Sequence, residues 1–171
     1  MRFFLKFRSV ELFILLVIPV IFSIVIPESG KHVFIPILNC IFFLLLFGWI
    51  FSTGNILGKQ WNENGSNLLL FKLCILIVVI SVIVFNIIGI AGSSNIYEIN
   101  KPLPLIISVI VLSAIFYCFY YVSKILRSLE LNRNVTFEQH QKEFFLFFIF
   151  VIGIWILQPR IRKLLNAGAN L

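Results

Sequence analysis

The chain has 171 residues, of which 60% are hydrophobic and 12% charged, and its mean hydropathy is +1.05. A soluble domain is about half apolar and about one quarter charged, so this composition excludes a water-soluble fold of this size and requires lipid as the main solvent. The net charge of +7 is typical of a membrane protein whose Lys and Arg residues set its topology and contact anionic lipid.

Five apolar runs predict an all-α fold, a polytopic transmembrane helix bundle that forms one domain over residues 1–171. The apolar segments are 10–27, 33–52, 68–91, 103–123 and 144–158. The second, third and fourth segments have about the 20 residues that one membrane crossing requires. The first segment follows a basic start without a signal-peptide cleavage site, so we interpret it as a retained span. Between the second and third segments we expect an inner loop that contains Gly54 and Gly58.

The fifth segment is short for a membrane crossing. Its uninterrupted apolar part, Phe144–Leu157, has 14 residues, or about 21 Å of helix against a hydrocarbon core of about 30 Å. It is apolar on all sides, so we expect it to be embedded rather than to lie on the membrane surface. Two alternatives follow: a short true span, or a re-entrant segment that bends at Gly153 or Pro159.

The distribution of Lys and Arg predicts a cytoplasmic N-terminus, because cytoplasmic loops of membrane proteins are enriched in these residues. With four crossings, the cations on the inner side are Arg2, Lys6, Arg8, Lys59, Lys124, Arg127, Arg133 and Lys142, and those in the outer loops are Lys31 and Lys101. Arg160, Arg162 and Lys163 join the inner set if the fifth segment re-enters, and the outer set if it crosses. The first option gives the stronger bias, so we expect four spans and a re-entrant fifth segment.

Each of the first four segments carries a neutral polar residue near its expected outer end. These residues are Ser23, Asn39, Asn86 and Ser108. Such side chains either form hydrogen bonds between helices or line a polar pocket that opens outward and binds a lipid headgroup or a small solute. No charged residue lies near the middle of a segment, which argues against an ion-coupled transporter.

The inner loop before the fifth segment contains Glu138, His140 and Glu143, which are too few for a confident metal-ligand set. We interpret the stretch as a solvated loop helix that begins after Thr136 as its N-cap. The sequence contains no recognisable catalytic motif, so we expect no catalytic residue, no cofactor and no metal.

The second and fourth segments end in aromatic residues. Trp49 and Phe51 close the second, and Tyr117, Tyr120 and Tyr121 close the fourth. Aromatic residues in these places are typical of belts at a membrane–water interface, so we expect belts at the inner face.

The stretches VSKILRSLELNRNVTF and EFFLFFIFVIGIWILQPRIRKLL resemble a family of small, uncharacterised multi-pass bacterial membrane proteins. The family carries an A-K-x-L-x-x-x-E element in its last inner loop and closes with a P-I-G-I-W-x-x-Q-P-x-I-N motif. The matching residues are Ser123, Lys124, Leu126, Glu130, Gly153, Ile154, Trp155, Gln158, Pro159 and Ile161. Val151 stands where the family has Pro, which favours a straighter last helix, and Arg162 stands where it has Asn. The resemblance implies an architecture and a motif but no activity.

The closing motif suggests how the last segment is held. Trp155 and Gln158 are three residues apart and are expected on one helix face, with Gln158 bonded to freed backbone or to a neighbouring helix. Pro159 is expected to end the helix, and Arg160 to form an interfacial ion pair with Glu130. The candidate motif residues are Lys124, Glu130, Trp155, Gln158, Pro159 and Arg160.

The expected function is non-enzymatic: an accessory or interaction subunit of the bacterial inner membrane. Its expected partners are the lipid bilayer, anionic lipid, and a membrane protein or a second copy of itself, but not nucleic acid. The alternative is a small carrier or pore that uses the outward-facing polar cluster. A lipid-modifying enzyme has the least support.

Overall fold

The computed structural model describes residues 3–27, 30–61, 65–91 and 102–168, and within these residues the secondary structure is helical, with no strand. The expected all-α class is therefore confirmed. The helices are α1 (Phe3–Lys6), α2 (Ser9–Val25), α3 (Lys31–Gln60), α4 (Gly65–Ala91), α6 (Pro102–Leu131), α7 (Phe137–Phe148) and α8 (Phe150–Gly168).

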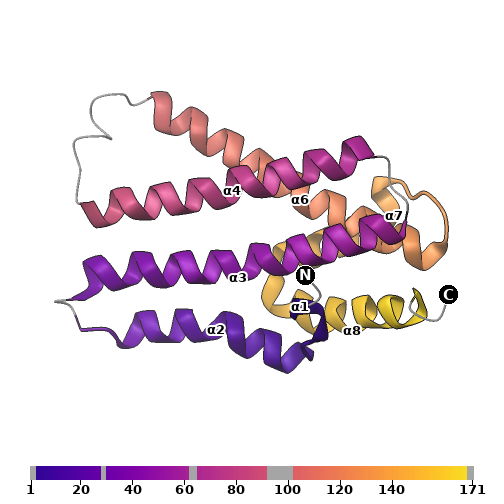
Figure 1. Cartoon of the computed structure of the whole chain (residues 1–171), viewed down its shortest axis with the longest axis horizontal. Coiled ribbons are helices and arrows are strands. Elements are labelled where there is room, and N and C mark those ends of the chain that lie inside the picture. Colours follow the sequence, from indigo (N-terminus) through magenta and orange to yellow (C-terminus); the bar gives the residue numbers. More distant parts are fainter. Residues whose placement is uncertain (1–2, 28–29, 62–64, 92–101, 169–171) are drawn as a thin grey trace.

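Helices α2, α3, α4 and α6 run along the long axis of the molecule in alternating directions, and α7 and α8 fold back beside one end of them (Figure 1). We call this end, where α3, α6 and α8 finish and α4 begins, the hairpin end. The far end is where α2 and α4 finish and α3 and α6 begin. The start of α7 and the end of α8 therefore lie at the same end of the bundle.

Three described helices are long and apolar enough to cross a membrane: Lys31–Gln60, Gly65–Ile88 and Leu105–Leu131. The first expected span forms α2, whose 17 residues make about 25 Å of helix and fall short of that length. The fifth expected segment does not form a single helix. Length and composition thus support a membrane protein with three candidate spans, fewer than the four spans and a fifth segment expected from the sequence.

Helix α3 continues to Gln60, so Gly54 and Gly58 lie inside a helix and the expectation of a loop there was wrong. Both glycines are buried at places where helices approach closely. A Cβ on Gly54 would lie 2.5 Å from the ring of Phe71 in α4, and one on Gly58 would lie 2.6 Å from the hydroxyl of Tyr121 in α6. The spacing of two small residues four apart therefore lets α4 and α6 pack against α3.

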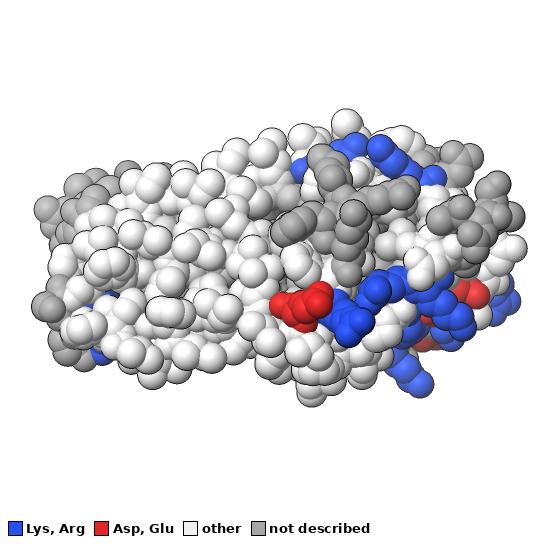
Figure 2. All heavy atoms as spheres, turned by 60° about the horizontal axis from the view of Figure 1, so that its bottom comes forward, with Lys and Arg blue, Asp and Glu red and all other residues white. Residues whose placement is uncertain are grey.

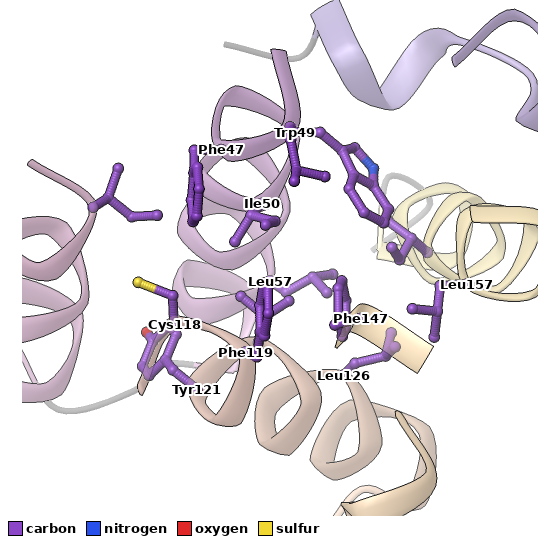
Figure 3. Packing of buried hydrophobic residues seen from close by; sticks show 14 of the residues in the cluster. Phe47, Trp49, Ile50, Leu57, Cys118, Phe119, Tyr121, Leu126, Phe147 and Leu157 are labelled. Carbon is purple, nitrogen blue, oxygen red and sulfur yellow. The ribbon is translucent and has the colours of Figure 1, made fainter. Parts of the chain in front are cut away.

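The apolar core lies towards the hairpin end, where α3, α6, α7 and α8 meet (Figure 3). Trp49 and Tyr121, expected at a membrane interface, are 0% and 3% exposed and belong to this core. The ring of Tyr121 stacks on Phe71 with centroids 4.5 Å apart, and Trp49 packs against Phe147 at 5.6 Å. The aromatic-belt interpretation was wrong for these two residues, because the helices extend beyond them and cover them.

The fifth apolar segment is broken at Ile149, whose φ of −92° and ψ of 63° end α7 and turn the chain into α8. The turn is closed by hydrogen bonds from Ile149 N to Phe145 O (2.8 Å) and from Gly153 N to Ile149 O (2.9 Å). Gly153 is needed in the turn because a Cβ there would overlap the carbonyl oxygen of Leu146. The bend thus lies before Gly153, and α8 continues through Pro159, which was expected to end the helix.

Candidate functional site

The α7–α8 hairpin is fixed to the bundle by a charged cluster that we call the arginine clasp. Arg160 of α8 donates from Nε to Glu130 Oε1 (2.7 Å), and from Nη2 to Glu130 Oε2 (2.5 Å) and to Glu143 Oε1 (2.7 Å). Arg127 adds a bond from Nη1 to Glu130 Oε2 at 3.1 Å. The expected pair of Glu130 and Arg160 is therefore present, and it is bidentate, the geometry in which Arg and carboxylate interact most strongly.

The sequence motif did not reveal Glu143, which the hairpin brings to Arg160 although 17 residues separate them. Its side chain is 6% exposed, against 28% for Arg160. The hydrogen bonds that Arg160 donates to Glu130 and to Glu143 raise the pKa of the Arg160 guanidinium above its usual value, the one to Glu130 contributing most, while burial opposes this. The clasp therefore joins the end of α6 and both arms of the hairpin through one permanently charged group.

Polar atoms around the clasp are not all satisfied. Within the described residues, Arg127 Nε, Ser128 Oγ, His140 Nε2 and Glu143 Oε2 are buried and have no hydrogen-bond partner. Buried polar groups are bonded in the great majority of cases, so these atoms mark the least saturated polar region of the described structure.

His140 lies beside the clasp on α7 and is 0% exposed. Its Nδ1 is 2.8 Å from the carbonyl oxygen of Thr136, which fits a neutral ring that donates from Nδ1. Thr136 is also the N-cap of α7, as the sequence predicted. Burial lowers the pKa of His140; the Thr136 carbonyl and Glu143 act in the opposite direction, and Lys124 lowers the pKa further.

Acidification is expected to destabilise the hairpin through His140. The pKa of His140 in the folded state is lower than the value of about 6.5 in an unfolded chain. Between these two pKa values the unfolded state therefore binds more protons than the folded state. The stability contribution is complete above about pH 6.5 and is lost as pH falls below it. Thermal unfolding in detergent at pH 7.5 and 5.5 should show a drop for the wild type and a smaller drop for His140→Gln. Equal drops would show that His140 does not titrate on folding.

Gln158 forms a second, uncharged attachment of the hairpin. Its Oε1 accepts a bond from Trp49 Nε1 at 2.9 Å, and its Nε2 donates to the carbonyl oxygens of Phe4 (3.2 Å) and Phe7 (2.9 Å). The side chain is 0% exposed. One amide therefore joins α8 to α3 and to the N-terminal segment, which agrees with the expectation of a bond to a neighbouring helix.

Replacing Gln158 with Leu is expected to lower the free energy of unfolding by about 2–3 kcal/mol, because it removes the hydrogen bond from the buried Trp49 N–H and the two hydrogen bonds to the part-buried carbonyl oxygens of Phe4 and Phe7. The matched control is Gln141→Leu, at an exposed position on α7, with an expected change within about 0.5 kcal/mol. Unfolding of each variant by SDS in mixed micelles gives the comparison. Equal stability of Gln158→Leu and Gln141→Leu would contradict the assigned role.

The other motif residues lie at the edges of this site. Trp155 is 47% exposed and its ring packs against Phe13 of α2 at 5.6 Å, so it does not share the buried side of Gln158. Three residues turn a helix by about 300°, which places the two side chains on either side of the boundary between core and surroundings. Lys124 is half-buried on α6 and influences His140.

The four polar residues of the far half are not joined by the hydrogen bonds that the structure gives for them. Ser23 donates to Val20 O at 2.7 Å and Asn86 donates to Val82 O at 2.7 Å, each within its own helix. Asn39 and Ser108 are exposed. A shared polar pocket therefore stays a prediction.

Sequence reasoning missed Trp49 as a hydrogen-bond donor and Glu143 as part of the clasp. The signal for Glu143 was present in α7, where His140, Glu143 and Phe147 recur at spacings of three and four and are all buried.

In the described residues no group of three or more His, Cys or acidic side chains is arranged to hold a metal ion. Comparisons with protein-family models, curated proteins and solved structures gave no match.

Proposed function

We propose that the chain is an integral protein of the bacterial inner membrane in which α2, α3, α4 and α6 cross the bilayer and the α7–α8 hairpin re-enters from the cytoplasmic side. The observation that carries this proposal is the charge distribution: the described Lys and Arg residues gather at the hairpin end, with Lys31 at the far end (Figure 2). By the positive-inside rule the hairpin end is then cytoplasmic, as is the N-terminus.

The hairpin geometry supports re-entry over a fifth crossing. If α8 continued across the membrane, Arg160 would lie on the side opposite to Glu130 and Glu143, which it contacts within 2.7 Å. The tip around Ile149, Val151 and Ile152 is apolar and exposed, as expected of a segment that ends inside the bilayer.

The proposed role is that of a non-enzymatic interaction subunit whose hairpin end binds anionic lipid headgroups. Lys59, Lys72, Lys142 and Lys163 are exposed there and form no ion pair within the described residues. A cation near an anionic membrane surface contributes about 1 kcal/mol of attraction, so several of them give a substantial preference for anionic lipid.

The alternative, a carrier or pore that uses Ser23, Asn39, Asn86 and Ser108, would need the hairpin end to open. The space between α3, α6 and the hairpin there is filled by Ile50, Leu57 and Leu126, which are 0% exposed. This packing favours an interaction subunit.

Two reporter fusions test the topology: a phosphatase that is active outside the cell, placed after Leu171 and separately between Asn132 and Thr136. The proposal predicts that both fusions are inactive and that a cytoplasmic reporter works at both sites. An active phosphatase after Leu171 together with an inactive one in the loop would show a fifth crossing and overturn the re-entrant hairpin.

Lipid preference is tested by native mass spectrometry of the purified protein with phosphatidylglycerol or phosphatidylcholine. Changing Lys59, Lys72, Lys142 and Lys163 to Gln should remove the excess of bound phosphatidylglycerol, while Lys31→Gln at the far end should not. Equal retention of the two lipids by the wild type would overturn the proposed role.

A further inference from the structure

The charged start of α2 lies beside α3 well short of the end of that helix (Figure 1). The ring of Phe4 in α1 lies 3.0 Å from where a Cβ on Gly48 would be. Arg8, the N-cap residue of α2, and Glu11 follow on the chain and are exposed, and Glu11 Oε2 accepts a hydrogen bond from Arg8 N at 2.8 Å. From Gly48 to Lys59, the cation near the end of α3, the helix rises about 16 Å.

The first charged residues of α4 and α6, counted from the far end, lie beside the same part of α3. On α4 this residue is Lys72, next to Phe71, whose ring stacks on Phe51 of α3 with centroids 6.4 Å apart. On α6 it is Lys124, three residues after Tyr121, whose ring stacks on Phe71 at 4.5 Å. Both lysines therefore lie near the middle of α3 and not at the level of its last turn.

The hairpin reaches its first charges at this level as well. Gln158 of α8 bonds to Trp49 of α3 at 2.9 Å, and Arg160 comes two residues later. Arg160 bonds to Glu143 of α7 at 2.7 Å, and the exposed Lys142 is adjacent to it. In Figure 2 the charged side chains likewise begin near the middle of the molecule, apart from those at the far end. We call the charged residues of this level the charged belt: Arg8, Glu11, Lys72, Lys124, Lys142, Glu143 and Arg160.

The protein surface changes character at the charged belt. On the hairpin side of the belt, the exposed large hydrophobic residues of the described chain are Leu69, Leu70, Leu131 and Phe137, and all others lie on the far side. In α3 no residue from 45 to 58 is exposed, and Ser52, Thr53 and Asn55 are buried there. A covered core beneath a largely polar surface is typical of protein in water, whereas helices that expose aliphatic residues along their length are typical of protein in lipid.

A bilayer surface at Lys59 would place charges deep in hydrocarbon. Arg8 and Glu11 would then lie about 16 Å inside a core of about 30 Å, close to the midplane and further than a side chain reaches by snorkelling. Exposed charges at that depth are costly. With the surface at the charged belt, the 17 residues of α2 span about 25 Å, and α3 from Lys31 to Gly48 spans about 27 Å, so both match the hydrocarbon core.

From these observations, and resting on the membrane embedding proposed above, we infer that the inner headgroup layer of the bilayer contacts the charged belt and that the end of the bundle beyond it stands in the cytoplasm as a folded head. The head rises about 15 Å beyond the belt. In the other direction the hairpin tip reaches Phe42, where the ring of Phe150 lies 5.5 Å away, about 10 Å into the hydrocarbon. The described segments of the head are 52–60, 65–71, 125–141 and 161–168.

The charged belt divides the four lysines of the proposed lipid-binding end into two pairs. Lys72 and Lys142 belong to the belt and contact the headgroups. Lys59 and Lys163 lie at the top of the head, where a hydrogen bond of 3.4 Å joins the ends of α3 and α8. The first pair therefore provides the preference for anionic lipid, and the second pair faces the cytoplasm.

The first test compares two double variants that remove the same charge. The protein is released from nanodiscs of phosphatidylglycerol and phosphatidylcholine, and native mass spectrometry counts the lipids that stay bound. Lys72→Gln with Lys142→Gln should reduce the excess of phosphatidylglycerol about fivefold or more, the effect of a cation at an anionic surface. Lys59→Gln with Lys163→Gln should leave most of the excess. Equal losses in the two double variants would overturn the inference.

The second test measures depth with nitroxide labels at single cysteines, in nanodiscs and in a background without the native cysteines. Gln141→Cys and Phe145→Cys form a matched pair, since both positions are exposed and lie about one turn apart on α7. The label at 141 should be more accessible to a water-soluble nickel chelate than to oxygen. The label at 145 should show the reverse, and that at Ile149→Cys should lie deeper still.

A label at 141 that lies in hydrocarbon, together with one at Gln60→Cys in water, would place the bilayer surface at the end of α3 and overturn the inference. Water accessibility at 141, 145 and 149 alike would show that the hairpin lies outside the bilayer, and would also overturn it. The reporter fusions report only the side of the membrane. A phosphatase active after Leu171 would therefore contradict the topology, whereas a shifted depth profile with silent reporters contradicts the charged belt alone.

Discussion

Replacing Arg160 with Met is expected to lower the free energy of unfolding by about 3 kcal/mol, the lower end of the cost of removing one partner from a buried ion pair, because Arg160 and Glu130 are only part-buried. Met keeps most of the side-chain length but leaves Glu130 and Glu143 facing each other without a cation. Both carboxylates are largely covered, with side-chain exposures of 18% and 6%. SDS unfolding in mixed micelles measures the change in the free energy of unfolding. The rate of protease cleavage within residues 132–136, between α6 and α7, reports release of the hairpin.

Two controls separate the clasp from a general effect of charge. Arg162→Met removes a cation from the same helix that forms no ion pair within the described residues, and its expected change is within about 0.5 kcal/mol. Adding Glu130→Gln and Glu143→Gln to Arg160→Met should restore most of the stability, because the uncompensated charges are gone. A loss for Arg162→Met as large as that for Arg160→Met would contradict the clasp.

The sequence predicted the long apolar helices and the Glu130–Arg160 pair because both depend on local signals. Uninterrupted apolar runs of about 20 residues have few alternatives to a membrane-buried helix. The pair was visible because Glu130 lies near the start of the last inner loop and Arg160 comes just after the last apolar segment. The core position of Trp49 was not visible, since an aromatic residue at the end of an apolar run is also typical of an interface.

The continuation of α3 to Gln60 depends on tertiary contacts that local sequence does not show. Its last stretch contains Ser52, Thr53, Gly54 and Asn55, which favour turns when they are exposed. Here Gly54 is covered by Phe71, and Thr53 bonds back to the carbonyl of Trp49 at 2.9 Å. Packing against α4 and α6 therefore overrides the local preference, and the same four residues are buried inside the bundle.

The position of the hairpin turn has only one weak local signal, Gly153, which lies after the break rather than in it. The chain breaks at Ile149 within FFLFFIFVIG, a stretch with no Pro, Asn or Asp before Gly153. The break follows from long-range attachments on both arms, with Glu143 and Arg160 joined at the base and Gln158 bonded to Trp49. Gly153 is the residue in this stretch that indicates the turn, because the backbone of α7 at Leu146 lies too close to residue 153 to leave room for a side chain.

Gly153→Ala is expected to destabilise the fold by about 3 kcal/mol or more, because the added Cβ would overlap the Leu146 carbonyl, a backbone atom that cannot move without opening the turn. A straight fifth helix predicts the opposite sign, since Ala in a helix interior is about 1 kcal/mol more favourable than Gly. The matched control is Gly65→Ala, where no atom lies within 4 Å of the added Cβ. SDS unfolding of both variants decides the matter: if Gly153→Ala is stabilised like an ordinary helix position, the chain passes straight through residue 153 and α7 and α8 form no hairpin.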